Sequence, residues 1–202
     1  MDSEGYTSHT LKPQEEEKDH KKTWNEEIAD LFPAKKPMPV SPIVKPGDSA
    51  PVKEDFPRLY RIWDVSQKYF FLVDNILVAN HQDSNAPEQL MEVLPNTALD
   101  SKMMPIFMGP QGRKQCLSCE KSAEDQLQLQ LKESDIKKLY EGKEKSLPFT
   151  FYSKTDGGPE TCSFESAEYP GWFLSTSSEP NKPVGLSRQG GTENTLFYFQ
   201  RQ

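Results

Sequence analysis

Beyond Pro57, apolar and polar side chains alternate in short runs that are separated by turn-forming residues. Alternation with period two places every second side chain on the same face of a strand, which is the pattern of a half-buried strand. Leu127, Leu129 and Leu131 are an example, with polar residues between them. Twelve such runs are predicted to be strands: Leu59–Asp64, Tyr69–Val73, Leu77–Ala79, Leu90–Leu94, Ile106–Met108, Gln115–Glu120, Leu127–Leu131, Phe149–Lys154, Ser163–Ser166, Trp172–Thr176, Val184–Ser187 and Thr195–Gln200.

Short strands at this spacing predict an all-β barrel or sandwich over residues 58–202. The strands divide into three groups of four that begin near Arg58, Met108 and Asp156, a spacing that suggests threefold organisation. Ser134–Tyr140 interrupts the pattern with a serine at a capping position and apolar residues on one side, and is predicted to be a short helix or turn.

The segment Phe164–Thr176 predicts a strand, a turn and a second strand. Tyr169-Pro170-Gly171 joins the fixed φ of proline to the permissive φ of glycine, as a chain reversal requires. Because a lone hairpin is marginal in water, the aromatic residues on both sides of this turn need a closed apolar interior, which the other strands must supply.

Residues 1–57 differ in composition from the rest of the chain. They contain 8 of the 17 prolines but only 4 aromatic residues. Such a segment cannot bury enough apolar surface to offset its ordering entropy, so we expect an acidic, largely disordered tail with an extended linker at Pro33–Pro57. Trp24–Phe32 has apolar residues at helical spacing with acids on the other side, which is typical of transient helix or of a short peptide that binds an intracellular partner.

The net charge of −7 divides into −4 over residues 1–57 and −3 over residues 58–202. Neither part offers the basic field that nucleic acid or an anionic membrane selects. The amino terminus has no basic start followed by an apolar run, and no apolar stretch approaches the roughly 20 residues that span a bilayer. We therefore expect a soluble monomer made in the cytosol.

Three cysteines, Cys116, Cys119 and Cys162, are too few for a disulfide scaffold. Cys116-Leu-Ser-Cys119 has the spacing of a metal or redox pair, but no second pair follows and the histidines are scattered. In a strand, positions three apart face opposite sides, so one of these two thiols is expected to point inward and the other outward. We expect no metal, no cofactor and no catalytic triad, and therefore no enzyme.

Four segments, in order, resemble the interleukin-1 family and most closely its receptor antagonists: Arg61-Ile-Trp-Asp-Val-Ser-Gln-Lys68, Cys116-Leu-Ser-Cys119, the signature Phe164–Thr176, and Phe197-Tyr-Phe-Gln200. The resemblance covers residues 58–202. It implies a β-trefoil of twelve strands, and a secreted ligand of immunoglobulin-type receptor ectodomains that acts in inflammatory and immune signalling.

The resemblance also implies which residues contact the receptor. Trp63, Gln67 and Tyr198 stand at positions that touch the primary receptor in the antagonists, while packing of Trp63 against the barrel end is the alternative. His81 stands where the antagonist has a tyrosine. Signalling relatives commonly carry an aspartate just before the last strand; Leu196 stands there, which favours an antagonist without settling the sign of signalling.

The tail contains two indications of a processing site. Asp48-Ser-Ala-Pro-Val-Lys53 resembles a junction that a caspase cuts after aspartate, and Lys45 is a poor match to the apolar preference of that protease. A second family rule places the amino terminus of the active protein nine residues before an apolar-x-Asp motif. The motif here is Ile62-Trp63-Asp64, so the rule predicts an amino terminus at Lys53. Trimming at Asp48 and release without a signal peptide are therefore expected.

A trefoil that binds carbohydrate or heparin is the main alternative function. Lectin trefoils usually repeat a Gln-x-Trp motif, which is absent from this sequence. Heparin binding would need a basic cluster, and residues 58–202 carry a net charge of −3.

Overall fold

In the computed structural model, residues 21–33 and 57–202 are described, and they form thirteen strands, two short helices and two 3₁₀ turns. The strands are β1 (Arg58–Asp64), β2 (Tyr69–Val73), β3 (Ile76–Asn80), β4 (Met91–Pro95), β5 (Pro105–Pro110), β6 (Gln115–Lys121), β7 (Leu127–Glu133), β8 (Phe151–Thr155), β9 (Thr161–Ser166), β10 (Phe173–Ser175), β11 (Lys182–Pro183), β12 (Gly185–Ser187) and β13 (Phe197–Arg201). The helical elements are α1 (Trp24–Ala29), η1 (Ser101–Met103), α2 (Ile136–Glu141) and η2 (Leu147–Phe149).

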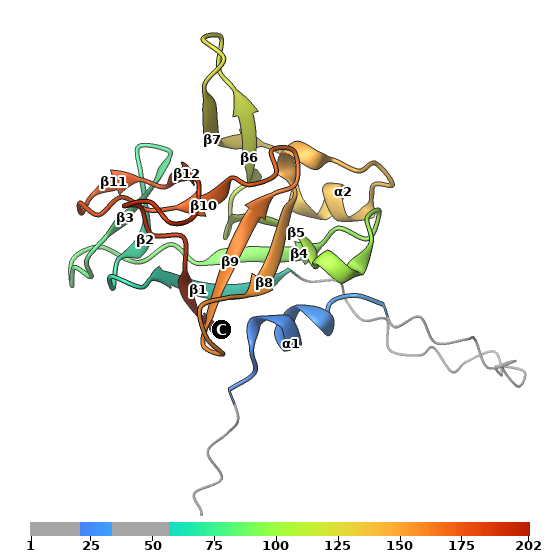
Figure 1. The fold of residues 1–202 in the computed structure, drawn as a ribbon, viewed down its shortest axis with the longest axis horizontal. Helices are drawn as coiled ribbons and strands as arrows, with labels where there is room; N and C mark the ends of the chain where they lie inside the picture. Colours follow the sequence, from blue (N-terminus) through green and yellow to red (C-terminus); the bar gives the residue numbers. More distant parts are fainter. Residues whose placement is uncertain (1–20, 34–56) are drawn as a thin grey trace, which may run out of the picture.

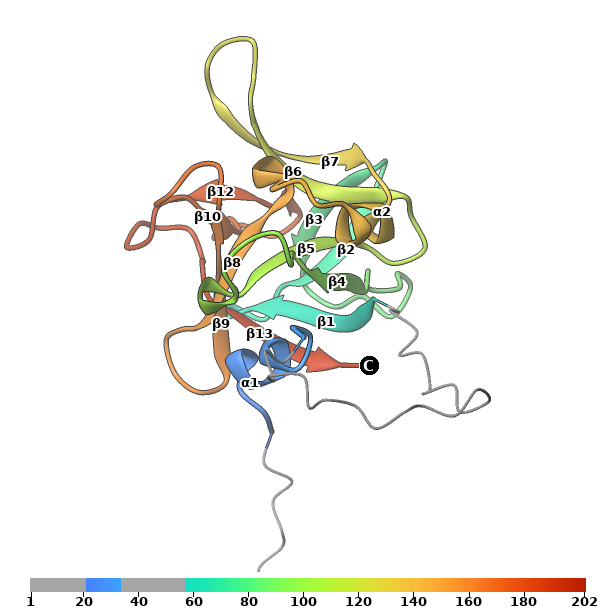
Figure 2. The same cartoon turned by 90° about the vertical axis from the view of Figure 1, so that its right-hand side faces the viewer.

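Six of the strands close into an antiparallel barrel. The pairing runs from β1 to β4, β5, β8, β9 and β13, and β13 pairs again with β1. The hairpins β2–β3, β6–β7 and β10–β12 complete the three groups of strands. The β6–β7 hairpin stands out from the end of the barrel opposite α1 (Figures 1 and 2). This arrangement confirms the all-β prediction, and it is the β-trefoil that the family resemblance implied.

Each predicted strand coincides with an observed one, with boundary shifts of a few residues. The two-residue strand β11, which pairs with β3, was not predicted. The predicted turn is confirmed, because the Trp172 N–H donates to the Tyr169 carbonyl at 3.2 Å and Gly171 has a φ of 88°. Proline at the start of η2 favours a 3₁₀ turn, so Phe149 lies in η2 and the predicted start of β8 at Phe149 is wrong.

The predicted helix at Ser134–Tyr140 is confirmed as α2, but serine is not its cap. The Ser134 N–H donates to the Lys114 carbonyl at 3.0 Å and therefore belongs to the base of the hairpin. Asp135 caps the helix instead, since its side chain accepts from the Lys137 N–H at 3.0 Å.

The barrel core is apolar and combines aliphatic side chains with several aromatic rings. Inward-facing residues of the six barrel strands meet in one buried cluster, which includes Tyr60, Phe151, Phe164, Phe197 and Phe199. The predicted alternation of Phe197 and Phe199 is confirmed, because both are buried and Tyr198 between them is not. The outer faces of β1 and β13 point away from the core, so their side chains are available for binding.

Both Cys116 and Cys119 are fully buried, and the expectation that one of them points outward is wrong. They do face opposite sides of β6: Cys119 lies in the main core, and Cys116 packs with Leu94, Phe107 and Ile136. Helix α2 packs on β4 and β5, and η2 packs on β6, so the outer face of β6 does not meet solvent at Cys116. All three cysteines are free thiols.

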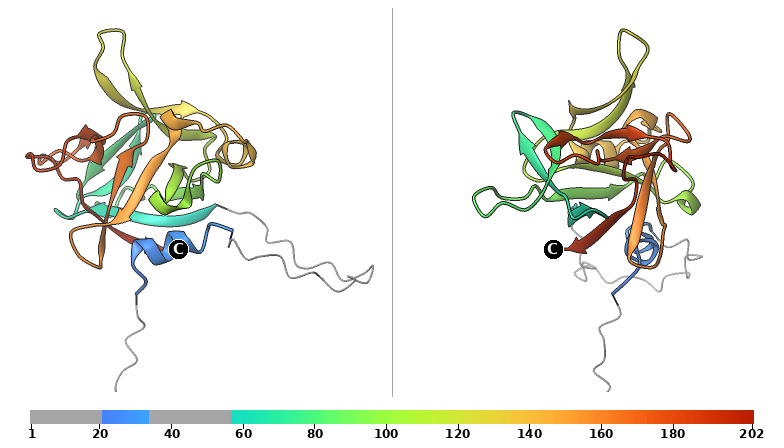
Figure 3. Two further views of the ribbon diagram at one scale, coloured as in Figure 1. Left: turned by 45° about the vertical axis from the view of Figure 1, so that its right-hand side comes forward. Right: turned by 60° about the vertical axis from the view of Figure 1, so that its left-hand side comes forward.

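Residues 21–33 differ from the expectation of a largely disordered tail. The helical spacing of Trp24 and Ile28 is confirmed, yet the helix α1 is packed on the barrel rather than transient, and both side chains have no exposed surface. In every view α1 lies against the barrel end formed by β1, β8, β9 and β13 (Figure 3). Residues 34–56 of the predicted linker, which include Asp48 and Lys53, lie outside the described residues.

Candidate functional site

Three aromatic rings lie side by side on the outer face of β1 and its neighbours. The Trp63 ring is stacked between those of Tyr69 and Tyr198, at centroid distances of 5.4 and 5.7 Å and interplanar angles of 17° and 22°. The register explains this row, because Trp63 pairs with Tyr69 of β2 and with Tyr198 of β13. Trp63 and Tyr198 are half-buried, and Tyr69 is 9% exposed. These three residues are termed the aromatic row.

An arginine lies against the aromatic row and is itself fixed by a carboxylate. The Arg61 guanidinium lies 4.5 Å from the centroid of the Tyr69 ring and 5.6 Å from that of Trp63. It donates two hydrogen bonds to Glu88, at 2.5 and 2.7 Å. This bidentate contact raises the pKa of Arg61 and lowers the pKa of Glu88. The row is therefore flanked by a rigid cation over a polar hollow of about 710 Å³.

The turn that follows Trp63 is held by a buried ion pair. Asp64 Oδ1 accepts hydrogen bonds from the N–H groups of Ser66 and Lys68, both at 2.9 Å, and Asp64 Oδ2 lies 3.0 Å from Lys68 Nζ. Thr176 and Asn194 also donate to Asp64 Oδ2. Because the Asp64 and Lys68 side chains are at most 1% exposed, the turn is locked to the third group of strands.

Gln67 lies in this locked turn. It is exposed and has a left-handed φ of 64°, and its N–H donates to the Asp64 carbonyl at 3.0 Å. A non-glycine residue in that conformation persists only where its surroundings hold it. The Gln67 side chain is thereby presented beside the aromatic row in a fixed backbone setting.

His81 and Leu196 lie near opposite ends of the row. His81 is exposed and follows Asn80, which pairs with Tyr69 across β2 and β3. Leu196 is half-buried and precedes β13; a Cβ atom on Gly157 would lie 2.5 Å from Leu196 Cδ1, so the leucine packs against the turn after β8. Leu196 lies just before β13, two positions from Tyr198.

The structure therefore brings Trp63 and Tyr198 into contact and sets Gln67, His81 and Leu196 around them. Arg61 and Tyr69 were missing from the predicted site. Tyr69 could have been found from the period-two pattern, since it and Phe71 alternate with the buried core residue Phe70. The contact of Arg61 with its rings depends on Glu88, which is 27 residues away in sequence.

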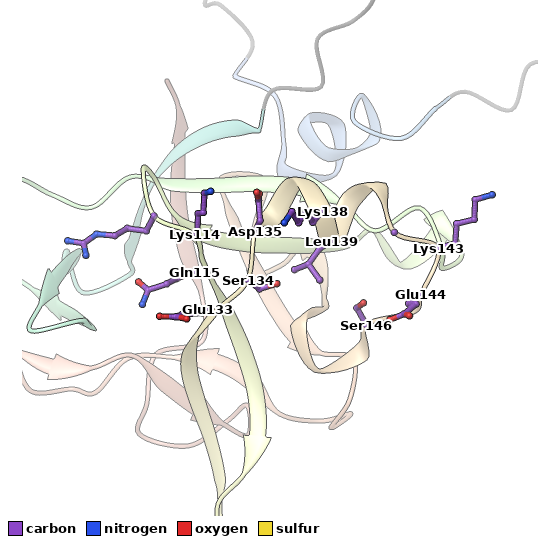
Figure 4. Close-up of a pocket in the computed structure, with 12 residues that line it drawn as sticks. Lys114, Gln115, Glu133, Ser134, Asp135, Lys138, Leu139, Lys143, Glu144 and Ser146 are labelled. Carbon is purple, nitrogen blue, oxygen red and sulfur yellow. The ribbon is translucent and has the colours of Figure 1, made fainter.

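A second hollow, of about 900 Å³, lies where the base of the β6–β7 hairpin meets α2 (Figure 4). The side chains that line it carry charges of both signs, which are the basic Arg113, Lys114, Lys138 and Lys143 and the acidic Glu133, Asp135 and Glu144. Because these charges nearly cancel, the hollow is not the basic cluster that a sulfated polysaccharide would select.

The cysteines are poor nucleophiles, because burial raises the pKa of Cys116 to about 12 and that of Cys119 to about 11. Within residues 21–33 and 57–202, no group of three or more histidine, cysteine or acidic side chains is placed to hold a metal ion. Over the same residues no helix is long and apolar enough to cross a membrane.

Comparison with known proteins extends these observations. A profile of the family described as Interleukin-1 / 18 matches residues 80–200. The interleukin-1 receptor antagonist protein of Sus scrofa is 42% identical over 151 residues, which cover 70% of this chain and 78% of that protein. The interleukin-36 receptor antagonist protein of Mus musculus is 40% identical over 149 residues, covering 70% and 93%.

Solved structures agree with the sequence matches. The crystal structure of chicken interleukin 1 beta superposes with a TM-score of 0.62 at 28% identity, and covers 72% of this chain and 99% of that one. The NMR structure of interleukin-36alpha gives a TM-score of 0.57 at 29% identity, covering 70% and 93%.

Proposed function

The chain belongs to the interleukin-1 family of cytokines, and we propose that its aromatic row and the residues around it bind an immunoglobulin-type receptor ectodomain of that family. The observation that carries this proposal is the stack of Trp63 between Tyr69 and Tyr198 on an open face. Gln67 and His81 extend the same surface with polar groups.

Two physical features favour this face over the rest of the surface. Tryptophan, tyrosine and arginine are enriched among the residues that dominate protein–protein binding energies, and Arg61, Trp63 and Tyr198 are grouped here. Stacking and the Arg61–Glu88 contact also hold the side chains in place before binding, which reduces the entropy lost on association.

We further propose that the protein is a receptor antagonist. Leu196 packs against Gly157 and offers no carboxylate at the position where signalling relatives commonly carry an aspartate. The two relatives named above at 40 and 42% identity are themselves receptor antagonist proteins. A ligand that binds the first receptor without recruiting a second would block signalling.

As a cytokine of this family the protein acts outside the cell. We propose that it is made as a cytosolic precursor and trimmed by a protease within residues 34–56, at Asp48 or with Lys53 as the alternative new amino terminus, and that it acts as a monomer. Incubation of the full chain with caspases, followed by mass spectrometry, tests the cut. The Asp48→Ala variant would stay intact if Asp48 is the site.

The receptor proposal is tested with the full chain on immobilised ectodomains of each receptor of the family. Saturable binding to at least one ectodomain is expected, and absence of binding to all of them would overturn the proposal. A cell reporter assay, with the protein alone and in competition with a family agonist, tests whether it activates or blocks signalling. Blockade without activation is expected. Activation would overturn the proposal of antagonism but not that of receptor binding.

The alternative of a carbohydrate- or heparin-binding trefoil gains no support from the proteins named above, which are cytokines and receptor antagonists. Because those proteins are cytokines and receptor antagonists, they support the proposal that this protein is not an enzyme. Elution from a heparin column below physiological salt is therefore expected.

A further inference from the structure

The short helix α1 is anchored by one side of its surface. Thr23 caps it, because its side chain accepts from the Glu26 N–H at 3.3 Å. Trp24, Glu27 and Ile28 face the barrel and are buried, whereas Glu26 is exposed. The helix is therefore amphipathic, and its buried side carries a tryptophan, an isoleucine and one carboxylate.

Trp24 is enclosed by aromatic side chains from three barrel strands. Its ring centroid lies 5.1 Å from that of Tyr60, 5.2 Å from that of Phe164 and 5.1 Å from that of Phe199. Two of these contacts are edge-to-face, the geometry that aromatic pairs prefer. Trp24 Nε1 has no hydrogen-bond partner among the described residues, so the contact is one of apolar and aromatic packing.

Polar contacts surround this aromatic site and fix the register of the helix. The Glu27 carboxylate accepts from Tyr60 Oη at 2.9 Å and from Arg58 Nη1 at 3.2 Å, and Arg58 Nη1 also donates to the Glu27 carbonyl at 2.6 Å. Asn25 and Thr155 exchange two hydrogen bonds: the Asn25 N–H donates to Thr155 Oγ1 at 3.1 Å, and the Thr155 N–H donates to Asn25 Oδ1 at 2.9 Å. The site thus recognises both the shape and the polar groups of α1.

The docked segment also reaches the edge of the aromatic row. Lys21 Nζ lies 4.8 Å from the centroid of the Phe199 ring and 5.9 Å from that of Trp63. The segment that carries α1 is therefore a neighbour of the surface to which receptor binding is assigned above.

We propose that this end of the barrel is a binding site for residues 21–33 as a separable chain, so that a cut between residues 34 and 56 leaves the N-terminal fragment bound as a non-covalent subunit. None of the contacts above needs the covalent link, which contributes only a high effective concentration. Because a six-residue helix is marginal alone, the free fragment is expected to fold as it binds. The inference goes beyond the proposed processing, because processing alone implies that the tail departs.

The experiment uses the full chain with the recognition sequence of a specific protease introduced within residues 38–47. After complete cleavage, gel filtration under native conditions separates bound from free fragment, and mass spectrometry identifies what elutes with the barrel. Co-elution in equal amounts is expected. A barrel that elutes without its fragment would overturn the proposal.

Exchange with added peptide makes the test independent of how variant barrels fold. A labelled peptide of residues 21–33 is added to the cleaved wild-type protein; we expect it to replace the resident fragment and to bind saturably. The peptide with Trp24→Ala is expected to bind on the order of 100-fold more weakly, since it leaves the aromatic site unfilled. The peptide with Glu26→Ala is the matched control, and it should bind as the unaltered peptide does.

Equal binding of the three peptides would contradict the assignment of Trp24 to the site. These readouts do not involve a receptor, so a failure of fragment binding and a failure of receptor binding are distinguishable.

Discussion

Two groups of aromatic residues occupy opposite faces of the same strands, and they differ in what covers them. On β1 and β13, Tyr60 and Phe199 point toward Trp24 and are closed off by α1, while Trp63 and Tyr198 point outward and stay half-exposed. Period-two alternation thus gives one pair of strands both an anchorage site and an open recognition face. Both groups consist of the same kinds of aromatic side chain. They differ in function because one group is buried under α1 and the other remains open to a partner.

The largest expected effect is on the covered group. Trp24→Ala should lower the free energy of unfolding by about 3–5 kcal/mol, because it empties a site lined by three aromatic rings. Chemical denaturation of the full chain measures this difference. A loss below about 1 kcal/mol would mean that α1 does not contribute to the fold, and the contrast between the two groups would fail.

On the open face the same kind of truncation should affect binding more than folding. Trp63→Ala is expected to weaken receptor binding by about 2 kcal/mol or more, roughly 30-fold, with a smaller change in stability. Trp172→Ala is the matched control, since Trp172 is also half-buried and also lies under an arginine, Arg188, at 5.0 Å. Equal losses of binding for both variants would refute the assignment of the aromatic row to the receptor.

Two neighbouring glutamates sharpen the contrast within α1. Glu27→Gln removes a buried charge that accepts hydrogen bonds from Tyr60 and Arg58, and should cost about 1–3 kcal/mol of stability. Glu26→Gln makes the same chemical change at an exposed position and should cost only a few tenths of a kcal/mol. The midpoints of thermal unfolding of the two variants measure this difference. Equal midpoints, or a lower midpoint for Glu26→Gln, would contradict the packing of Glu27 against the barrel.

The smallest expected effect is on pH dependence beside the aromatic row. The hydrogen bonds from Arg61 lower the pKa of Glu88 below its usual value of 4.5, so the stabilisation is complete above pH 4.5 and is lost as the pH falls through the lowered pKa. The loss should be about 1 kcal/mol or less, because the pair is partly exposed. The difference in unfolding free energy between the wild type and Glu88→Gln, followed from pH 6 to pH 3, should shrink as Glu88 protonates.

The strands were predictable because their alternation is a local property of the sequence. The docking of α1 was not, since a short apolar helix looks the same whether it is free or packed, and its partners Tyr60 and Phe164 come from distant strands. The expectation that one of Cys116 and Cys119 points outward was wrong for a related reason: a strand pattern cannot show that a helical element covers the second face of the strand.

The candidate site was predictable in part. Trp63 and Tyr198 could be named from the family resemblance, and their contact follows from the pairing of β1 with β13. The buried ion pair of Asp64 and Lys68, which holds the turn that contains Gln67, could not be predicted from the sequence. Its hydrogen-bond partners Thr176 and Asn194 are more than 100 residues away along the chain.

The most direct test is a structure of the full chain bound to its receptor ectodomain. We expect Trp63 and Tyr198 to lose their remaining exposed surface at the interface, with Gln67 at its border and α1 still packed on Tyr60 and Phe199. An interface formed instead by the hollow between the β6–β7 hairpin and α2, with Trp63 left open to solvent, would contradict it.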